Sequence, residues 1–363
     1  IAIMRSVSFN SIARGNKLLL TGTLLSLFAT AVTASYIMPN QKKKTIPQTE
    51  EEKNLPENLE VQYFTNRRSQ KIHYVTTRAK GDAKAKVFHI TGLAEHCTRH
   101  GYLHMYKTLS DAGIEIHAMD LHGHGRSEGP RAYCDKFTDF VDDAEDFIVK
   151  GRGNETKKLP IILMGQSLGG LIATYTALRI GMDTIAGIIA TSPAYGVDLD
   201  VVKKVQLFFA PVLDLCIPTA KMVDAVRNED LTHDVDEIKR HEADPLIING
   251  KTPIRTGRVV LQAMDELKKK RKEITCPCLI IHGSMDSITS IDASMDFYKN
   301  IGTPKEKRCY LRCPGAKHET LTESVKDILL GEIIKFASSG GTVFPDKQNK
   351  SDDGIVDIVA KKN

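Results

Sequence analysis

The sequence predicts an α/β fold, in which a mostly parallel β-sheet is covered by helices on both faces and carries a helical insertion. Three observations support this fold class. Apolar stretches with the composition of buried strands alternate with amphipathic stretches of about ten to fifteen residues, as in proteins built on parallel sheets. Several of the apolar stretches end at a glycine or an aspartate. The alternation breaks down once, between residues 196 and 257.

The elements can be assigned in chain order from these patterns. Two short strands around a polar turn are expected at residues 61–64 and 72–75. Apolar runs then predict buried strands at residues 85–92, 113–120, 159–165, 185–193, 276–283 and 307–313. Apolar residues at helical spacing predict helices at residues 102–112, 137–150, 168 onward, 293–300 and 319–337.

Residues 196–257 are predicted to form a cap over the carboxyl ends of the strands, where ligands bind in sheets of this kind. The block contains helical stretches at 201–216 and 219–228, followed by polar loops and the sequence HEADPLIING. Its apolar part, residues 205–217, favours a surface that faces an acyl chain or a membrane. Ordinary packing within the cap is the alternative interpretation.

Residues 1–39 are expected to act as an N-terminal hydrophobic anchor or signal segment. The uncharged stretch begins at Leu18 and ends at Met38. It holds about 20 residues, which is near the length of a helix that crosses a bilayer. Small residues near its end would also suit a cleaved signal peptide. A buried core helix and an organellar targeting segment are further alternatives. The expected location is therefore a membrane or the secretory pathway.

The remaining boundaries follow from composition. Residues 40–58 are polar, charged and interrupted by proline, which predicts an exposed linker. The folded domain is expected to span residues 59–338. Residues 339–363 contain a run rich in serine, glycine and charged residues, which predicts a flexible C-terminal tail.

The charge and cysteine content argue against two classes of function. Charged residues make up 26% of the 363 residues, the net charge is +5, and no basic block with interleaved aromatic residues occurs in the body of the chain. Nucleic-acid binding is therefore not expected. The seven cysteines lack the spacing of a zinc site. Most of them are expected on buried strands, and one or two disulfides would form in an oxidising compartment.

The most informative stretch is LPIILMGQSLGGLIATYTAL, residues 159–178, which fits the pattern G-x-S-x-G around Ser167. A strand is expected before the serine and a helix after it, as the pattern requires. In such a turn the serine side chain stands clear of the sheet. The residues two before and two after it, Gly165 and Gly169, must be small because other backbone lies close to them. The helix N-terminus directs free N–H groups and a positive dipole end at the same point.

A serine needs a histidine base, and the base needs a carboxylate that orients it. In this architecture the acid and then the histidine follow late strands. Asp286 follows the run 276–283, and His318 follows the run 307–313. The alternative for Asp286 is a plain loop carboxylate. His282 lies at a strand end and is expected to be packed or to support the acid.

The oxyanion formed during such a reaction needs two main-chain N–H donors. One candidate is Leu168, directly after the serine. The other is Leu93, in the loop that follows the strand at 85–92.

With these residues placed, the chain resembles the monoacylglycerol lipase and lysophospholipase group of α/β-hydrolases, which is also catalogued near the serine aminopeptidases. The resemblance covers about residues 59–337. It rests on a series of ordered motifs: TGLAEHCTRHGYLHMYKTLSDAGIEIHAMDLHGHGRSEGPR, FTDFVDDAEDFI, LMGQSLGGLIA, TSPAY, HEADPL, IIHGSMDSITS and GAKHETLTE.

The resemblance implies an α/β-hydrolase fold with an eight-stranded sheet and a helical cap that shapes an acyl channel. It also implies no cofactor and no metal. The site residues that it implies are Ser167, Asp286 and His318 as the catalytic triad, with Leu93 and Leu168 as oxyanion donors.

The sequence departs from the family pattern at two places. Thr91 precedes Gly92 where the family usually has histidine, and Gln166 precedes the serine where the family often has histidine. Neither change removes a catalytic atom. The first bears on how the loop of Leu93 is supported.

Together these features predict a serine hydrolase that cleaves the carboxylic ester of a single-chain lipid, a monoacylglycerol or a lysophospholipid, through an acyl-enzyme on Ser167. The alternative is an esterase or peptidase for small soluble substrates. A peptide amine would need acidic cap residues, for which Asp198, Asp200, Asp214 and Asp224 are candidates. A non-catalytic binding module is a remote alternative. Membrane association through the N-terminal segment or the cap is expected.

Overall fold

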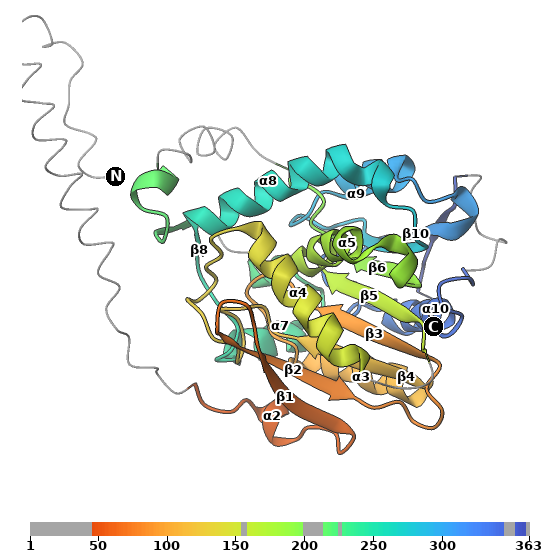
Figure 1. Ribbon diagram of the computed structural model, residues 1–363, viewed down its shortest axis with the longest axis horizontal. Coiled ribbons are helices and arrows are strands. Elements are labelled where there is room, and N and C mark those ends of the chain that lie inside the picture. Colours follow the sequence, from red (N-terminus) through yellow and green to blue (C-terminus); the bar gives the residue numbers. More distant parts are fainter. Residues whose placement is uncertain (1–45, 154–157, 199–212, 224–226, 345–352, 361–363) are drawn as a thin grey trace, which may run out of the picture.

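The computed structural model describes residues 46–153, 158–198, 213–223, 227–344 and 353–360 (Figure 1). A nine-stranded sheet runs through the molecule in the order β1-β2-β4-β3-β5-β6-β9-β10-β11. The two pairings β1–β2 and β2–β4 are antiparallel, and the other pairings are parallel. The strands are β1 Leu59–Thr65, β2 Lys71–Thr77, β3 Ala85–Ile90, β4 Ile114–Met119, β5 Ile161–Gln166, β6 Gly187–Thr191, β9 Cys278–Gly283, β10 Arg308–Cys313 and β11 Ile355–Asp357.

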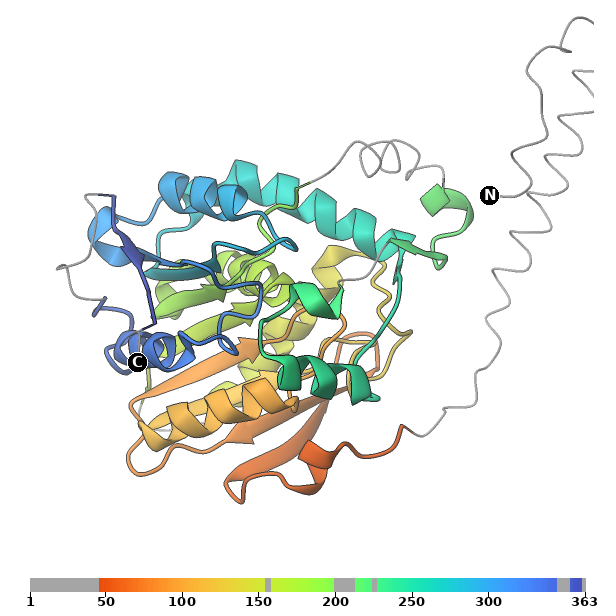
Figure 2. The same cartoon turned by 180° about the vertical axis from the view of Figure 1, so that it is seen from behind.

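Helices cover both faces of the sheet, as Figures 1 and 2 show from opposite sides. Helices α4 and α5 pack on one face with α8 and α9, and α3 and α10 pack on the other. Because both faces are covered, β3, β4, β6 and β9 are buried at every residue, which explains their nearly continuous apolar sequences. The helices are α3 His100–Asp111, α4 Phe137–Arg152, α5 Leu168–Ile180, α8 Ile254–Lys270, α9 Ile291–Asn300 and α10 Lys326–Ser338.

The predicted α/β class and the eight predicted strands are present, but the C-terminal part differs in two ways. Part of the tail that was expected to be flexible forms the ninth strand, β11, which pairs in parallel with β10 and places Asp357 beside Arg312 at 2.6 Å. The last helix, expected from residue 319, begins only at Lys326. The intervening residues form a loop because their polar groups bind the cap: the Glu319 N–H donates to the Leu231 carbonyl and Glu323 accepts from the His233 N–H.

The described part of the cap is less helical than predicted. Residues expected to form a helix at 219–228 include the short strand β7 Lys221–Val223, which pairs with β8 Thr252–Pro253. Helix α7 Val235–Ala243 follows, and residues 199–212, with most of the predicted apolar stretch, lie outside the described residues. The carboxylate of Asp214 is buried and binds Arg255 and Arg258 of α8, which joins the cap to the domain.

Six of the seven cysteines are buried, as expected for small apolar residues of the core. No helix in the described part of the chain has the length and apolar character needed to cross a membrane. The predicted anchor or signal segment, from Leu18 to Met38, lies outside the described residues.

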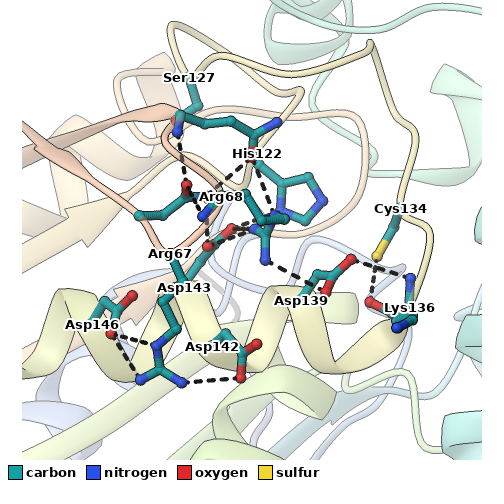
Figure 3. Close-up of polar contacts among 12 residues, drawn as sticks. Arg67, Arg68, His122, Ser127, Cys134, Lys136, Asp139, Asp142, Asp143 and Asp146 are labelled. Atoms are coloured by element: carbon teal, nitrogen blue, oxygen red, sulfur yellow. Dashed lines mark hydrogen bonds and ion pairs between the residues drawn. The ribbon is translucent and has the colours of Figure 1, made fainter.

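A polar cluster fastens the turn between β1 and β2 to helix α4 (Figure 3). The buried carboxylate of Asp143 accepts hydrogen bonds from Asn66 at 2.8 Å and Arg68 at 2.6 Å, and His122 Nδ1 lies 2.7 Å from it. One turn further along the helix, Asp146 binds Arg67 at the surface at 2.8 Å. The same helix therefore carries one buried and one exposed ion pair with adjacent arginines of the turn.

We predict that Asp143→Ala lowers the free energy of unfolding by about 3 kcal/mol, because it leaves the cationic Arg68 without its buried partner. The matched change Asp146→Ala removes an exposed pair and should cost less than about 1 kcal/mol. Urea unfolding followed by circular dichroism measures both values. Equal effects of the two substitutions would contradict the assignment of a stabilising role to the buried pair.

Candidate active site

Ser167 lies in the tight turn between β5 and α5, with the strained backbone angles φ +53° and ψ −119°. A positive φ is rare for a residue other than glycine and persists only where the surroundings impose it. The Ser167 N–H donates to the Thr191 carbonyl of β6, and the Ser167 carbonyl accepts from Gly170 and Ala194. These contacts hold the serine at the carboxyl ends of the strands.

The two glycines of the pattern are required by close packing, as predicted. A Cβ atom on Gly165 would overlap the main chain of Gly169, and one on Gly169 would overlap the Ile90 carbonyl at the end of β3. The first turn of α5 can thus lie directly against β3 and β5. This packing directs the N-terminus of α5 toward Ser167.

Asp286 and His318 form a hydrogen-bonded pair, with 2.8 Å between Asp286 Oδ2 and His318 Nδ1. The other carboxylate oxygen accepts from the main-chain N–H groups of Ile288 and Thr289 at 2.8 and 3.0 Å. His282 Nε2 lies 3.0 Å from Oδ2, so this buried histidine supports the acid. Asp286 is therefore a fully partnered carboxylate that fixes the orientation of the His318 ring.

The pKa values of this pair move in opposite directions. Burial alone raises the pKa of Asp286, but His318 and His282 outweigh burial and hold that pKa well below its ordinary range. Burial alone lowers the pKa of His318, but the Asp286 carboxylate outweighs it and raises that pKa above 6.5. Glu319 and Glu95 add to the increase. The acid stays ionised while the histidine is made more basic, which suits a general base.

The main chain of His318 is held by two side chains that the sequence patterns did not identify. Ser192 Oγ donates to the His318 carbonyl at 2.6 Å, and Gln166 Nε2 donates to the same oxygen at 3.3 Å. Thr191 Oγ1 in turn donates to Gln166 Oε1 at 2.5 Å. Gln166, which stands where the family often has histidine, thus links the turn of the nucleophile to the backbone of the base.

The candidate oxyanion donors Leu93 and Leu168 line the same cavity as Ser167. No acceptor among the described residues takes either main-chain N–H. Glu95 shapes the Leu93 loop, since its carboxylate accepts from the Gly92 N–H at 2.5 Å and from the Tyr102 hydroxyl at 2.8 Å. Thr91, in place of the family histidine, donates to the Met119 carbonyl at 3.2 Å.

The buried carboxylate of Asp120 supports this loop from below. It accepts hydrogen bonds from the main-chain N–H groups of Cys97 at 2.7 Å and Arg126 at 2.8 Å, and His73 Nδ1 lies 2.7 Å away. The donor atoms of His73, Cys97 and Asp120 lie within 4.8 Å of one another, close enough for a metal. Hydrogen bonds already occupy the carboxylate, so the cluster is explained as a structural junction between strand β2 and two loops.

A cavity of about 310 Å³ contains Ser167, His318 and both candidate oxyanion donors. Most of its wall is apolar on the side of α8, where Val260, Leu261 and Met264 line it. A larger cavity of about 660 Å³ lies next to it, between α8 and α9, and shares Leu261 and Met264. The smaller one is the candidate active site because it holds the reactive side chains.

Charged residues gather where the cavity meets helix α7 of the cap. The buried Arg99 binds Glu95 at 2.8 Å and Glu319 at 3.0 Å, and lies 3.7 Å from Glu237 of α7. His241 lines the same region. Burial, together with the charge of Arg99, lowers the pKa of His241 to about 4, so its ring is neutral at pH 7. The cavity thus joins an apolar wall to a polar one.

The family model described as "Serine aminopeptidase, S33" matches residues 81–325, which is more than half of the chain. The chain belongs to this family. The matched region contains every candidate site residue, from Leu93 to His318. The family assignment agrees with the resemblance that the motifs indicated.

Curated relatives and solved structures agree with this family. The chain is 26% identical over 260 residues to a monoacylglycerol lipase of Mycolicibacterium smegmatis, covering 71% of this chain and 89% of that protein. It is 27% identical over 247 residues to a human monoglyceride lipase, covering 67% and 80%. Among solved structures, a soluble variant of the Saccharomyces cerevisiae monoglyceride lipase superposes with a TM-score of 0.69 at 20% identity, covering 84% of this chain and 99% of that chain. The last likeness shows the α/β-hydrolase fold.

We predict that kcat/KM rises with pH through the pKa of His318, because the base must be neutral to accept the serine proton. The midpoint of this rise, which we call the acid limb, should therefore lie above pH 6.5, the ordinary pKa of histidine. Glu319→Gln removes a negative charge that raises this pKa, so it should move the limb to lower pH. The control Glu242→Gln changes an exposed residue of α7 and should leave the limb in place. A limb that stays unchanged or moves upward in Glu319→Gln would refute the electrostatic coupling.

We predict that Gln166→Leu lowers kcat about ten-fold with little change in KM, because the loss of a buried hydrogen bond loosens the backbone of His318. Steady-state kinetics with a short activated ester measures this. Thr176→Val removes a buried hydroxyl that bonds only within α5 and should leave kcat unchanged. An unaltered kcat in Gln166→Leu would mean that Ser192 alone holds the histidine.

Proposed function

We propose that this chain is a carboxylic ester hydrolase that cleaves single-chain lipids, monoacylglycerols or lysophospholipids, through an acyl-enzyme on Ser167. The observation that carries the proposal is the cavity itself. Ser167 and His318 lie in a cavity with an apolar wall along α8 and a polar wall beside α7. A lipid with one acyl chain and a polar head group matches these two walls, with the acyl chain against the apolar wall and the head group against the polar one. The curated relatives are named as a monoacylglycerol lipase and a monoglyceride lipase.

The residues have distinct parts in the proposed reaction. His318 takes the proton of Ser167 while the serine oxygen attacks the ester carbonyl, and Asp286 stabilises the imidazolium that forms. The N–H groups of Leu93 and Leu168 bind the oxyanion. The alcohol leaves with the proton from His318. Water then attacks the acyl-enzyme by the same steps and releases the fatty acid.

Peptide hydrolysis is the second candidate, because the family model carries the aminopeptidase description. It receives less support from the side chains. Asp214, one of the acidic residues that could recognise an amine, is already bound by two arginines. Glu95 and Glu319 face the cavity but share Arg99. Asp198 lines the cavity, whereas Asp200 and Asp224 lie outside the described residues.

Association with a membrane is part of the proposal. It is supported by the uncharged stretch from Leu18 to Met38 and by the lysines that follow it at 42–44. An enzyme held at a bilayer would meet lipid substrates where they accumulate.

The test is fatty-acid release from monooleoylglycerol and from oleoyl-lysophosphatidylcholine. The unmodified chain should turn over at least one of them, and Ser167→Ala should lose about 10⁴-fold or more of the rate. Ser287→Ala changes another serine that lines the cavity and should retain activity. Cleavage of a short activated ester or an aminoacyl anilide, with neither lipid turned over, would replace the lipid assignment by the small-substrate one.

A further inference from the structure

The segment that precedes the first strand is fastened to the domain by one arginine. Residues 46–53, which we call the N-terminal clip, were expected to belong to an exposed linker. Instead, Arg126 donates to the carbonyls of Ile46 and Pro47, both at 2.7 Å. Its guanidinium also binds the Glu52 carboxylate in a two-pronged pair at 2.8 and 2.5 Å. Paired hydrogen bonds of this kind are among the stronger polar contacts in proteins.

The clip has a defined local structure of its own. Thr49 caps the one-turn helix α2 Glu50–Lys53: its hydroxyl accepts from the Glu52 N–H at 3.0 Å, while the Glu52 carboxylate accepts from the Thr49 N–H at 2.9 Å. Thr49 is buried although it lies outside the sheet. Glu52 thus closes the capping box and binds Arg126 at once, so its replacement removes both contacts.

The clip lies at the end of the domain that carries the active site. Arg126 belongs to the loop after β4, and its own N–H donates to Asp120, the carboxylate that also supports the loop of Leu93. Glu51 of α2 lines a narrow crevice together with Arg240 and His241 of cap helix α7. His241 in turn lines the catalytic cavity. The chain that leads to the N-terminal segment therefore leaves the domain beside the cap.

The clip shortens the length of chain that can extend between Met38 and the domain. If residues 39–58 were all free, the tether from Met38 to β1 could extend about 70 Å. With residues 46–53 fastened, only residues 39–45 remain, and these reach at most about 25 Å. That shorter distance is less than the thickness of the hydrocarbon core of a bilayer, roughly 30 Å.

We infer that the N-terminal clip orients the enzyme on a lipid surface, with the cap and the cavity facing the bilayer that holds residues 18–38. The inference rests on the membrane association that is part of the proposed function. The partner is a bilayer because residues 39–45, between the uncharged stretch and the clip, contain the three lysines 42–44, which favour an anionic head-group layer. The cap also exposes large apolar side chains, with Leu215 82% and Val235 60% exposed.

The experiment uses the full chain reconstituted into phosphatidylcholine vesicles that contain phosphatidylserine and monooleoylglycerol. Arg126→Ala and Glu52→Ala open the clip, and Glu50→Ala is the matched control, because Glu50 lies on the same helix but its side chain binds only at the exposed surface. Hydrolysis of vesicle lipid should fall several-fold in the first two variants and not in the control. Hydrolysis of a short soluble ester should stay within two-fold in all three.

A second measurement reports orientation without catalysis. A donor fluorophore on Val235→Cys, in a Cys216→Ser background that leaves only buried cysteines, transfers energy to acceptors in the lipid head groups. Transfer should be high with the clip closed and lower in Arg126→Ala and Glu52→Ala.

The outcomes separate the inference from the proposed function. Unchanged vesicle rates and unchanged energy transfer in both clip variants would overturn the inference and leave lipid hydrolysis intact. High energy transfer that falls in the clip variants, without turnover of lipid by any form, would uphold the orientation and refute the lipid substrate.

Discussion

The close approach of helix α5 to strands β3 and β5 is the constraint on which the active site depends. It is possible only because Gly165 and Gly169 carry no side chain where main chains meet. The same contact holds Ser167 in its left-handed conformation and directs the first N–H groups of α5 at the serine. The positions of the nucleophile and of the oxyanion site therefore both follow from this one contact between α5 and the strands. The strain at Ser167 is sustained by the buried sheet around it.

Around this corner, buried carboxylates act as junctions between separate segments of the chain. Asp120 joins β2, the loop of Leu93 and the loop that contains Arg126, while Asp286 joins His318, His282 and its own loop. An ionised carboxylate is stable in the interior only when several donors surround it, and main-chain N–H groups and histidine rings supply most of them here. Each junction thus fixes loop geometry that packing alone would leave loose.

The cap is tied to the domain mainly by charge. Arg99 links the loop of Glu95 with Glu319 and with Glu237 of α7, and Asp214 links the cap to α8 through two arginines. Ion pairs of this kind specify the position of a part while adding little net stability. The cavity beneath the cap consequently has a charged wall on the side of α7 and an apolar wall on the side of α8. These two walls correspond to the polar head group and the acyl chain of a single-chain lipid.

The α/β class, the eight principal strands and the placement of Ser167, Asp286 and His318 after the strands that carry them could all be predicted from the sequence. These follow from local rules: apolar runs make buried strands, and the G-x-S-x-G pattern requires a strand, a tight turn and a helix. The polar side chains that support these residues could not be predicted, because they are set by the three-dimensional packing of the chain. Gln166 and Ser192 at the His318 carbonyl, Arg126 at the N-terminal clip and β11 beside β10 depend on partners distant in the chain. A side chain's spacing along the sequence carries no information about such partners, because the fold brings them together from separate strands and loops.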